Sequence, residues 1–457
     1  MKKQAAPAGP GPLLSRRTML RRGAQGFGAL GLSLFGNAVA VPVARAGGAD
    51  DFGPLLPADG NGLRLPLGFS SRIVAETGVL VPNAAQTPHV WHGEPDGGAT
   101  FSTVDGGWVY VSNAELGSGG AGALRFAADG TITDAYTILS GTSANCAGGP
   151  TPWGTWLSCE EVPAGRVYEC NPMAASQGVL VPTLGTFKHE AAAVDQVHLK
   201  VYLTEDRVNG RLYRFSPTSY PSLASGTLEV AEILDPNELG DIAPGESRTL
   251  AWHPLLDPNP VGGGINDPFH QPAVERATRF QVSASTEFDG GEGCWYSGLR
   301  VYFSTKGDDR VWEIDTRTDQ ISIYYDQATH PSPLLAGVDN VYVATNRDVY
   351  VGEDGGNMEI VALTPSGGVH PIVQITGVTG SEVTGPALSP DGTRLYFSSQ
   401  RDPGMTYEVT GPFAPRGEGV PALGGWAVGV LAAALVAAAR LRGCTAARLR
   451  GSRSAGG

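Results

Sequence analysis

The chain has 457 residues, with 32 Lys or Arg and 45 Asp or Glu, and its net charge is −13. This acidic balance argues against a nucleic-acid-binding protein, because such proteins need basic faces. The 64 glycines and 34 prolines, together with few segments of helical period, favour strands and turns over a helical bundle.

Residues 1–46 contain seven basic residues and no acidic residue. Within them, Ser15-Arg16-Arg17-Thr18-Met19-Leu20 precedes a weakly apolar run that continues to about Ala40. This arrangement predicts a twin-arginine signal peptide. We therefore expect export by the twin-arginine machinery to the periplasm or cell envelope.

Residues 47–416 form the predicted folded domain, which is long enough for one large domain or two ordinary ones. This segment holds 20 basic and 44 acidic residues, a net charge of −24. Clustered carboxylates repel one another unless something neutralises them. The excess therefore suits either a well-solvated secreted surface or a set of bound cations.

Six short segments of similar sequence repeat along this domain. Each is a β-branched and aromatic strand that ends in polar residues, with aromatic positions at Tyr110, Trp156, Tyr202, Tyr302, Tyr350 and Tyr396. Four of the five gaps are 46 or 48 residues, and one is 100. A period near this size predicts an all-β fold, a single β-propeller of six blades.

The long gap predicts an insertion around residues 216–280, with a short helix near residues 236–239. A seventh blade within this segment is the alternative.

One of the six segments carries a thiol directly before two carboxylates, Cys159-Glu160-Glu161, in the run T-P-W-G-T-W-L-S-C-E-E. Thiolate and carboxylate together suggest a metal ligand set. The alternative is a half-buried cysteine at a strand end, followed by solvated acids.

Four repeats have a recognisable partner strand upstream, and each pair predicts a hairpin. The start of the first strand then lies beside the end of the second, which brings acids together at one end of a central channel. The expected pairings are Glu190 with Glu205 and Asp206, Asp339 with Glu353 and Asp354, Glu292 with Lys306, and Glu382 with Gln400. This set predicts a cation site made of several acids.

The remaining cysteines of the domain, Cys146, Cys170 and Cys294, are candidates for a disulfide in an oxidising compartment. Three pairings are possible, and the sequence does not choose among them.

Residues 417–457 read as a linker, an apolar segment and a basic tail. The apolar run over residues 421–439 can just span a bilayer, and five arginines follow it. The layout is similar to the C-terminal sorting tails of bacterial surface proteins, and it predicts membrane association. The alternative is a C-terminal core helix.

At the level of longer motifs, the chain resembles the PhoX alkaline phosphatase family. The resemblance rests on W-G-T-W-L-S-C-E-E, F-K-H-E-A-A-A-V-D, V-Y-L-T-E-D-R, G-G-E-G-C-W-Y, V-Y-F-S-T-K-G-D-D-R-V-W-E, S-P-D-G-T-R-L-Y-F-S-S-Q and T-Y-E-V-T-G-P-F, in order over residues 65–413. It implies a β-propeller with an iron–calcium cluster on its axis (Fe³⁺ and Ca²⁺), and hydrolysis of phosphate esters of small molecules.

Carried onto this chain, the resemblance implies that Cys159 binds iron and that Glu190 and Glu292 bind or bridge the metals. The candidate metal ligands are Cys159, Glu160, Glu190, Glu205, Asp206, Glu292, Asp339, Glu353 and Glu382. The candidate catalytic residues are Cys159, Glu190 and Glu292.

One position departs from the family pattern, because Gly290 stands where the family's phosphatases have an arginine, two residues before the glutamate that matches Glu292. Lys306 is the candidate substitute for binding the substrate, with Arg207 and Arg310 as further possibilities. The leading hypothesis is therefore an exported metal-dependent phosphomonoesterase. A non-catalytic, calcium-stabilised propeller that acts as an envelope binding module is the alternative, and a calcium-dependent propeller hydrolase of lactones or phosphotriesters is a third.

Overall fold

The computed structural model describes residues 48–82, 88–234, 242–243 and 245–413. The expected signal peptide, the short helix near residues 236–239 and the apolar tail lie outside these ranges. Within them, no helix has the length and apolar character needed to cross a bilayer.

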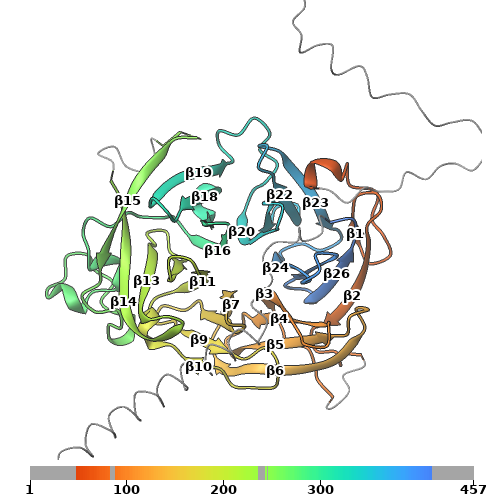
Figure 1. Cartoon of the computed structure of the whole chain (residues 1–457), viewed down its shortest axis with the longest axis horizontal. Helices are drawn as coiled ribbons and strands as arrows, with labels where there is room; N and C mark the ends of the chain where they lie inside the picture. Colours follow the sequence, from red (N-terminus) through yellow and green to blue (C-terminus); the bar gives the residue numbers. More distant parts are fainter. Residues whose placement is uncertain (1–47, 83–87, 235–241, 244, 414–457) are drawn as a thin grey trace, which may run out of the picture. The chain divides into compact units, whose positions relative to one another are not determined.

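Strands dominate the described residues, and they form five antiparallel sheets placed around a common centre (Figure 1). The first two sheets follow the chain in order. The first contains β3 (Pro95–Ser102), β4 (Trp108–Ala114), β5 (Gly119–Phe126) and β6 (Ile132–Thr142). The second contains β7 (Asn145–Pro150), β8 (Trp156–Glu160), β9 (Val167–Cys170) and β10 (Val179–Leu180).

The third sheet has nine strands. Its first part is β11 (His189–Asp195), β12 (Lys200–Glu205), β13 (Leu212–Ser219) and β14 (Ser222–Ile233). Its second part is β16 (Gly291–Ser297), β17 (Arg300–Thr305), β18 (Arg310–Asp315) and β19 (Gln320–Asp326). The strand β15 (Ser247–Pro254) pairs with both β14 and β19 and joins the two parts.

The last two sheets recruit strands from the start of the described chain. One contains β20 (Val338–Val343), β21 (Val349–Glu353), β22 (Glu359–Leu363), β23 (Val369–Ile375) and β1 (Leu63–Arg64). The other contains β24 (Val383–Leu388), β25 (Arg394–Ser399), β26 (Met405–Thr410) and β2 (Ser70–Glu76). Because β2 pairs with β26, an early strand completes the last sheet.

Short 3₁₀ turns are the helical elements of the described chain. They are η1 (Ala49–Asp51), η2 (Pro182–Leu184), η4 (Val261–Gly263), η5 (Ala273–Glu275), η6 (Thr278–Phe280) and η7 (Lys306–Asp308).

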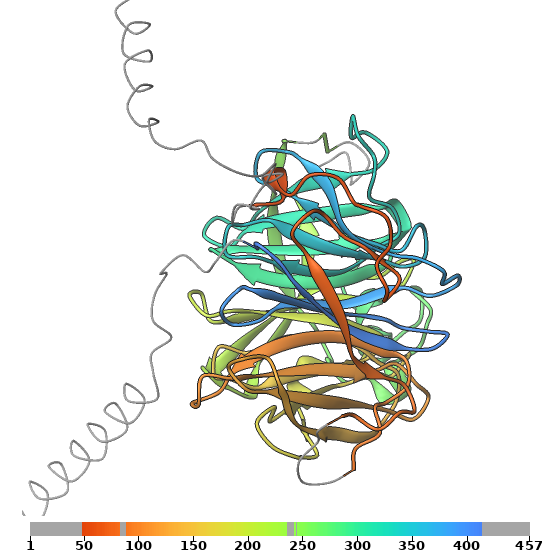
Figure 2. The ribbon, with the colours of Figure 1, turned by 90° about the vertical axis from the view of Figure 1, so that its right-hand side faces the viewer.

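The predicted all-β, propeller-like architecture is confirmed by this arrangement, and the perpendicular view shows the sheets as successive layers (Figure 2). Six separate blades are not confirmed, because β15 merges two four-stranded meanders into one hydrogen-bonded sheet. The predicted start of the insertion, at residue 216, is too early. Residues 216–233 belong largely to β13 and β14, and the irregular segment with η4, η5 and η6 follows β15.

The six repeated aromatic residues occupy equivalent strands. Each lies on the second strand of a four-stranded meander and is at most 4 % exposed. They are Tyr110 on β4, Trp156 on β8, Tyr202 on β12, Tyr302 on β17, Tyr350 on β21 and Tyr396 on β25. The period in the sequence therefore reports a structural repeat.

The first strands of the meanders line the centre. Each contacts the next around the circle, and β24 contacts β3. The approach is close enough to require glycine: a Cβ on Gly149 would lie 1.6 Å from the carbonyl oxygen of Ala192, and one on Gly293 would lie 2.3 Å from the amide nitrogen of Val341. The cavity left between these strands is only about 20 Å³, which has room for about one water.

All four cysteines of the described chain are free thiols: Cys146, Cys159, Cys170 and Cys294. The expected disulfide among Cys146, Cys170 and Cys294 is therefore not formed in this structure.

Candidate metal centre

The first strands present a ring of chemically similar side chains at one end of the centre. In every meander the first residue of the first strand pairs with the last residue of the second strand. The ladder is irregular directly after this pair in five meanders and one residue later, after Thr384, in the sixth. Such bulges redirect side chains. The second residues of these strands, here called the inner ring, are Asp96, Cys146, Glu190, Glu292, Asp339 and Thr384.

A second ring follows from the same register. The residue directly after the end of each second strand lies beside the start of its hairpin partner. These residues, here called the outer ring, are Glu115, Glu161, Asp206, Lys306, Asp354 and Gln400. The inner-ring side chains are buried, whereas those of Lys306 and Asp354 are 38 % and 36 % exposed. The centre therefore opens to solvent on the outer-ring side.

Members of the two rings form three overlapping groups that could each hold a metal ion, with ligand atoms that all lie within 4.8 Å of one another. The groups are Asp96–Glu115–Cys146, Cys146–Glu161–Glu190 and Glu190–Glu292–Asp339. Cys146 and Glu190 each belong to two groups, so neighbouring groups share a ligand.

The buried polar atoms fit bound cations. The Sγ of Cys146 donates to Oε1 of Glu190 at 3.1 Å, but Oε2 of the same carboxyl has no hydrogen-bond partner although Glu190 is fully buried. A buried carboxylate oxygen without a partner costs several kcal/mol when ionised unless a cation or a proton satisfies it. Oxygen and sulfur donors in this number are a metal-binding donor set.

Electrostatics give the same indication. Burial, followed by the negative charges of Glu292 and Glu161, raises the pKa of Glu190 well above its ordinary value. Burial also raises the pKa of Glu161 to about 9 and that of Asp339 to about 6, with like charges contributing at both. Without cations, the carboxyls of Glu190 and Glu161 retain protons to a higher pH than free carboxyls do, so metal binding there releases protons.

Three basic side chains stand at the solvent-facing edge. Lys188 pairs with Glu161 and Asp206. Arg401 lies 2.8 Å from Glu382 and 3.6 Å from Glu115, and Lys306 lies 2.8 Å from Glu292. Nine acids belong to the rings or pair with these cations: Asp96, Glu115, Glu161, Glu190, Asp206, Glu292, Asp339, Asp354 and Glu382. Three positive charges leave six negative charges unbalanced if every acid is ionised.

The structure brings together part of the ligand set expected from sequence. Glu190, Glu292 and Asp339 form one group, and Asp206 lies in the outer ring. Glu382 adjoins Asp339, to which it is hydrogen-bonded. Two of the expected hairpin neighbours are in contact. The ammonium of Lys306 pairs with the carboxylate of Glu292, and the backbone N–H of Gln400 donates to the backbone carbonyl of Glu382 at 3.1 Å.

Three expected glutamates do not join the site. Glu160 accepts the amides of Ser143 and Arg166, and Glu353 accepts those of Ala336 and Glu359. Glu205 is held by Tyr213 at 2.8 Å and Arg279 at 3.1 Å. All three occupy the last position of a second strand. Because successive strand residues point to opposite faces, the residue one position later is the one that faces the centre.

Cys159 is likewise absent from the three groups. Its side chain is fully buried in an apolar cluster with Leu157, Val167 and Phe187. Burial raises the pKa of both Cys159 and Cys146 well above the ordinary value, so the two thiols are distinguished by their neighbours, which are other candidate ligands only for Cys146. The structure places Cys146, not Cys159, in the thiol position of the site.

Cys146 and Asp96 were missed because partner strands were recognised for four repeats only. The strand pairing identifies the two partner strands that were not recognised. In their meanders, Pro95-Asp96-Gly97 and Asn145-Cys146-Ala147 are equivalent to His189-Glu190-Ala191. A polar residue followed directly by glycine or alanine, a short distance before five of the six repeated aromatics, is a signal that the sequence does contain; Asp339, which Asn340 follows, is the exception.

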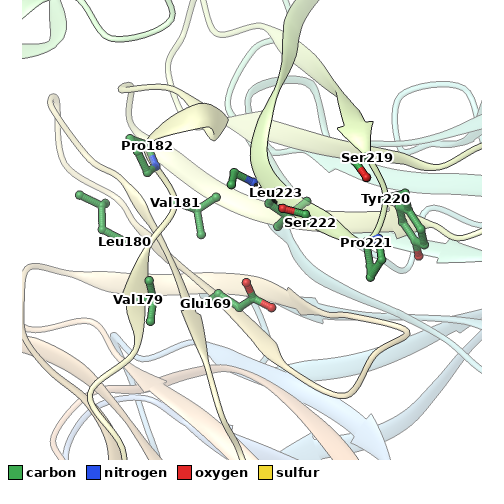
Figure 3. Close-up of a pocket in the computed structure, with 11 residues that line it drawn as sticks. Glu169, Val179, Leu180, Val181, Pro182, Ser219, Tyr220, Pro221, Ser222 and Leu223 are labelled. Carbon is green, nitrogen blue, oxygen red and sulfur yellow. Dashed lines mark hydrogen bonds between the residues drawn. The ribbon is translucent and has the colours of Figure 1, made fainter. Parts of the chain in front are cut away.

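The other end of the sheets holds a larger hollow that no ring residue lines. This cavity of about 610 Å³ lies between β10 and the turn from β13 to β14 (Figure 3). Its wall is mostly apolar, with Val179 and Leu180 on one side and Tyr220 and Pro221 on the other. Glu169 is the acid of this wall, and its Oε1 accepts from Trp153 and Thr155. The cavity is separate from the candidate metal centre.

Comparison with known proteins assigns the family. The model of the family described as Alkaline phosphatase PhoX matches residues 79–171 and 163–328, which together span more than half of the chain. The chain belongs to the PhoX family. No match was found among curated protein sequences.

Solved structures agree with a PhoX fold. Pseudomonas fluorescens PhoX, solved in complex with vanadate, a transition state analogue, is 16 % identical with a TM-score of 0.61. The match covers 79 % of this chain and 98 % of that one. A gluconolactonase, XC5397 from Xanthomonas campestris, is 13 % identical, covering 78 % and 97 % of the two chains, with a TM-score of 0.41. That score is too low to carry a conclusion.

Proposed function

We propose that this PhoX-family protein is a metal-dependent phosphomonoesterase whose active centre is the pair of rings. The observation that carries the proposal is the overlap of three ligand groups around the partnerless Oε2 of Glu190. The centre is closed from behind by the packed first strands and is open in front. A phosphate ester approaching from the front would meet every ligand group from the same side.

Donor chemistry suggests which cation each group prefers. The thiol of Cys146 belongs to two groups, and a thiolate favours a transition metal such as iron. The Glu190–Glu292–Asp339 group has oxygen donors only, which suits calcium. Bound at these groups, cations would supply the positive charge that the nonbridging and leaving oxygens of a phosphate dianion require.

The chain's own residues provide positioning and charge balance. Lys188 and Arg401 each hold two acids in place at the rim, which keeps the ligands oriented before a substrate arrives. Their side chains are 24 % and 37 % exposed, so both remain available to an anionic substrate. They are better placed for this role than Arg310, which pairs with Asp308 and Asp326.

The test compares two cysteines. Cys146→Ser should abolish hydrolysis of a chromogenic aryl phosphate in the presence of iron and calcium, and it should lower the bound iron, because a hydroxyl does not replace a thiolate at such a metal. Glu190→Gln should do the same by removing a ligand of two groups. Cys159→Ala is the control, with activity retained. Loss of activity in Cys159→Ala but not in Cys146→Ser would refute the assignment.

One observation favours the non-catalytic alternative. Gly290 stands where the resemblance places an arginine. Its φ of +67° means that an arginine there would have a strained backbone. Restoring Arg at this position is therefore a poor test. Wild-type turnover at background, unresponsive to iron and calcium, would favour a cation-stabilised binding module.

Three further proposals follow from sequence or topology. We infer six blades, by dividing the nine-stranded sheet at β15, because its two parts each repeat the four-stranded meander of the other sheets. The twin-arginine motif and the apolar segment over residues 421–439 support export and anchoring in the envelope. Fractionation of expressing cells into periplasm and membrane would test export and anchoring.

A further inference from the structure

One position of the outer ring has the opposite charge to its equivalents. Four of the six outer-ring residues are acidic, namely Glu115, Glu161, Asp206 and Asp354, and Gln400 is neutral. Lys306 occupies the remaining position, directly after β17. Because the register of β16 with β17 matches that of the other meanders, Lys306 is the true equivalent of these acids.

The ammonium of Lys306 is turned into the ligand set. Its Nζ lies 2.8 Å from Oε1 of Glu292 and 3.5 Å from Oδ2 of Asp354. Glu292 is 2 % exposed and belongs to the group that it forms with Glu190 and Asp339. The lysine therefore neutralises acids of the inner and outer rings at the same time, as a bound cation would.

We propose that Lys306 is a built-in cation that takes the place of one divalent ion, so that this chain binds one ion fewer than a centre with an acid at that position. The inference rests on the proposed function only in assuming that the rings bind cations. The charges agree with this exchange. A lysine in place of an acid makes the centre more positive by two units, which is the charge of one calcium ion.

This role differs from the substrate contact expected from the sequence. The ion pairs of Lys188 and Arg401 are to acids outside the inner ring, whereas the ammonium of Lys306 lies against Glu292, a buried ligand of the inner ring, as well as Asp354. Loss of a substrate contact would raise KM and leave the number of bound ions unchanged. Loss of a built-in cation changes the number of bound ions whether or not the protein hydrolyses anything.

The experiment counts calcium ions in charge-changed variants. Purified wild type and Lys306→Glu are dialysed against excess Ca²⁺, and bound calcium per chain is measured by elemental analysis. Lys306→Glu should bind one more Ca²⁺ per chain than the wild type. Arg300→Glu is the matched control, because Arg300 begins the same strand at its far end and pairs with Glu313; its calcium count should equal that of the wild type.

A second variant serves if Lys306→Glu does not fold. Lys306→Met leaves Glu292 and Asp354 without their partner, so in chelator it should melt at a lower temperature than the wild type. Added Ca²⁺ should then raise its melting temperature by more than it raises that of Arg300→Met. Equal calcium counts and equal calcium responses in the Lys306 variants and their controls would overturn the proposal. A wild type without phosphatase activity would contradict the proposed function, but not this inference, if the additional ion still binds.

Discussion

At the scale of single residues, neighbouring positions in one strand end have different functions. Glu160 and Glu161 are adjacent, yet Glu160 binds two loop amides whereas Glu161 joins Cys146 and Glu190. The same division separates Glu205 from Asp206. Where a second strand ends in two consecutive acids, the carboxylate that follows the strand faces the centre, and the one that ends it does not.

This division predicts opposite phenotypes for adjacent substitutions. Glu161→Gln should weaken metal binding by about tenfold or more, because it removes a ligand. Glu160→Gln should leave metal affinity unchanged and destabilise the fold by about 1–3 kcal/mol, the usual effect of weakening a buried hydrogen-bonded group. Metal titration and urea unfolding of both variants measure the two effects separately. Equal loss of metal affinity in both would contradict the assigned faces.

The raised pKa of Glu161 predicts how the metal-free protein responds to pH. Burial first, and then hydrogen bonds and charge from Asp206 and Glu115, raise this pKa to about 9, whereas the unfolded chain titrates near about 4.3. The folded state therefore binds the additional proton, and its contribution to stability is complete below about pH 4 and is lost as the pH rises through about 9.

In chelator, we therefore expect the melting temperature to fall as the pH rises from about 5 to about 9. With saturating Ca²⁺ the fall should be smaller, because the cation replaces the proton. Thermal melts over this pH range, with and without calcium, check the prediction. A melting temperature in chelator that rises over this range would contradict it.

At the scale of elements, the first strands combine two demands. They must carry the ring residues, and they must pack closely enough to close the centre from behind. Glycine and alanine after the ring positions meet the second demand, as in Gly97, Ala147 and Gly293. The bulge that follows each ring residue meets the first, because it turns the side chain toward the centre.

Close packing of these strands predicts an intolerant glycine. A Cβ at Gly149 would lie 1.6 Å from the carbonyl oxygen of Ala192, so Gly149→Ala should destabilise the fold by about 3 kcal/mol or more through overpacking. Gly117→Ala is the control, since nothing lies within 4 Å of a Cβ there. Urea denaturation compares the two, and similar midpoints would contradict the packing.

At the scale of the whole molecule, the circle of sheets depends on strands that are distant in sequence. The strand β2 pairs with β26 and completes the last sheet. The ion pair between Arg72 and Glu408, at 2.7 Å, crosses the same pairing. This pairing closes the circle through the last meander, whose first strand β24 contacts β3, where the two ends of the inner ring meet.

Closure predicts that a change in β2 affects the distant metal centre. Val74 is 2 % exposed and belongs to the core beside β26, so Val74→Asp buries an unpaired charge. It should lower the melting temperature strongly and increase metal loss to a chelator. Ile73→Asp, at a neighbouring position that is 40 % exposed, is the control with little change. If Val74→Asp were destabilised but retained its metal as well as the wild type does, the metal centre would not depend on the pairing of β2 with β26.

The repeat and the class of fold could be predicted from the sequence alone. The spacing of the aromatic residues identified the second strand of each meander, because repeats of similar length each bury a large side chain on that strand. The exact position differs, since Tyr110 and Trp156 lie one residue further from the strand end than the other four. The family motifs, and acids such as Glu190, Glu292 and Asp339, were also readable, since they stand next to those strands.

Which side chains of each strand end meet could be learned only from the folded chain. Whether Glu160 or Glu161 faces the centre depends on a register in which one position reverses the direction of the side chain, and bulges shift that register locally. The choice of Cys146 over Cys159 depends on the same geometry, because each thiol lies on a different strand of one hairpin. The joining of two meanders by β15 likewise depends on long-range hydrogen bonds, which leave no periodic trace in the sequence.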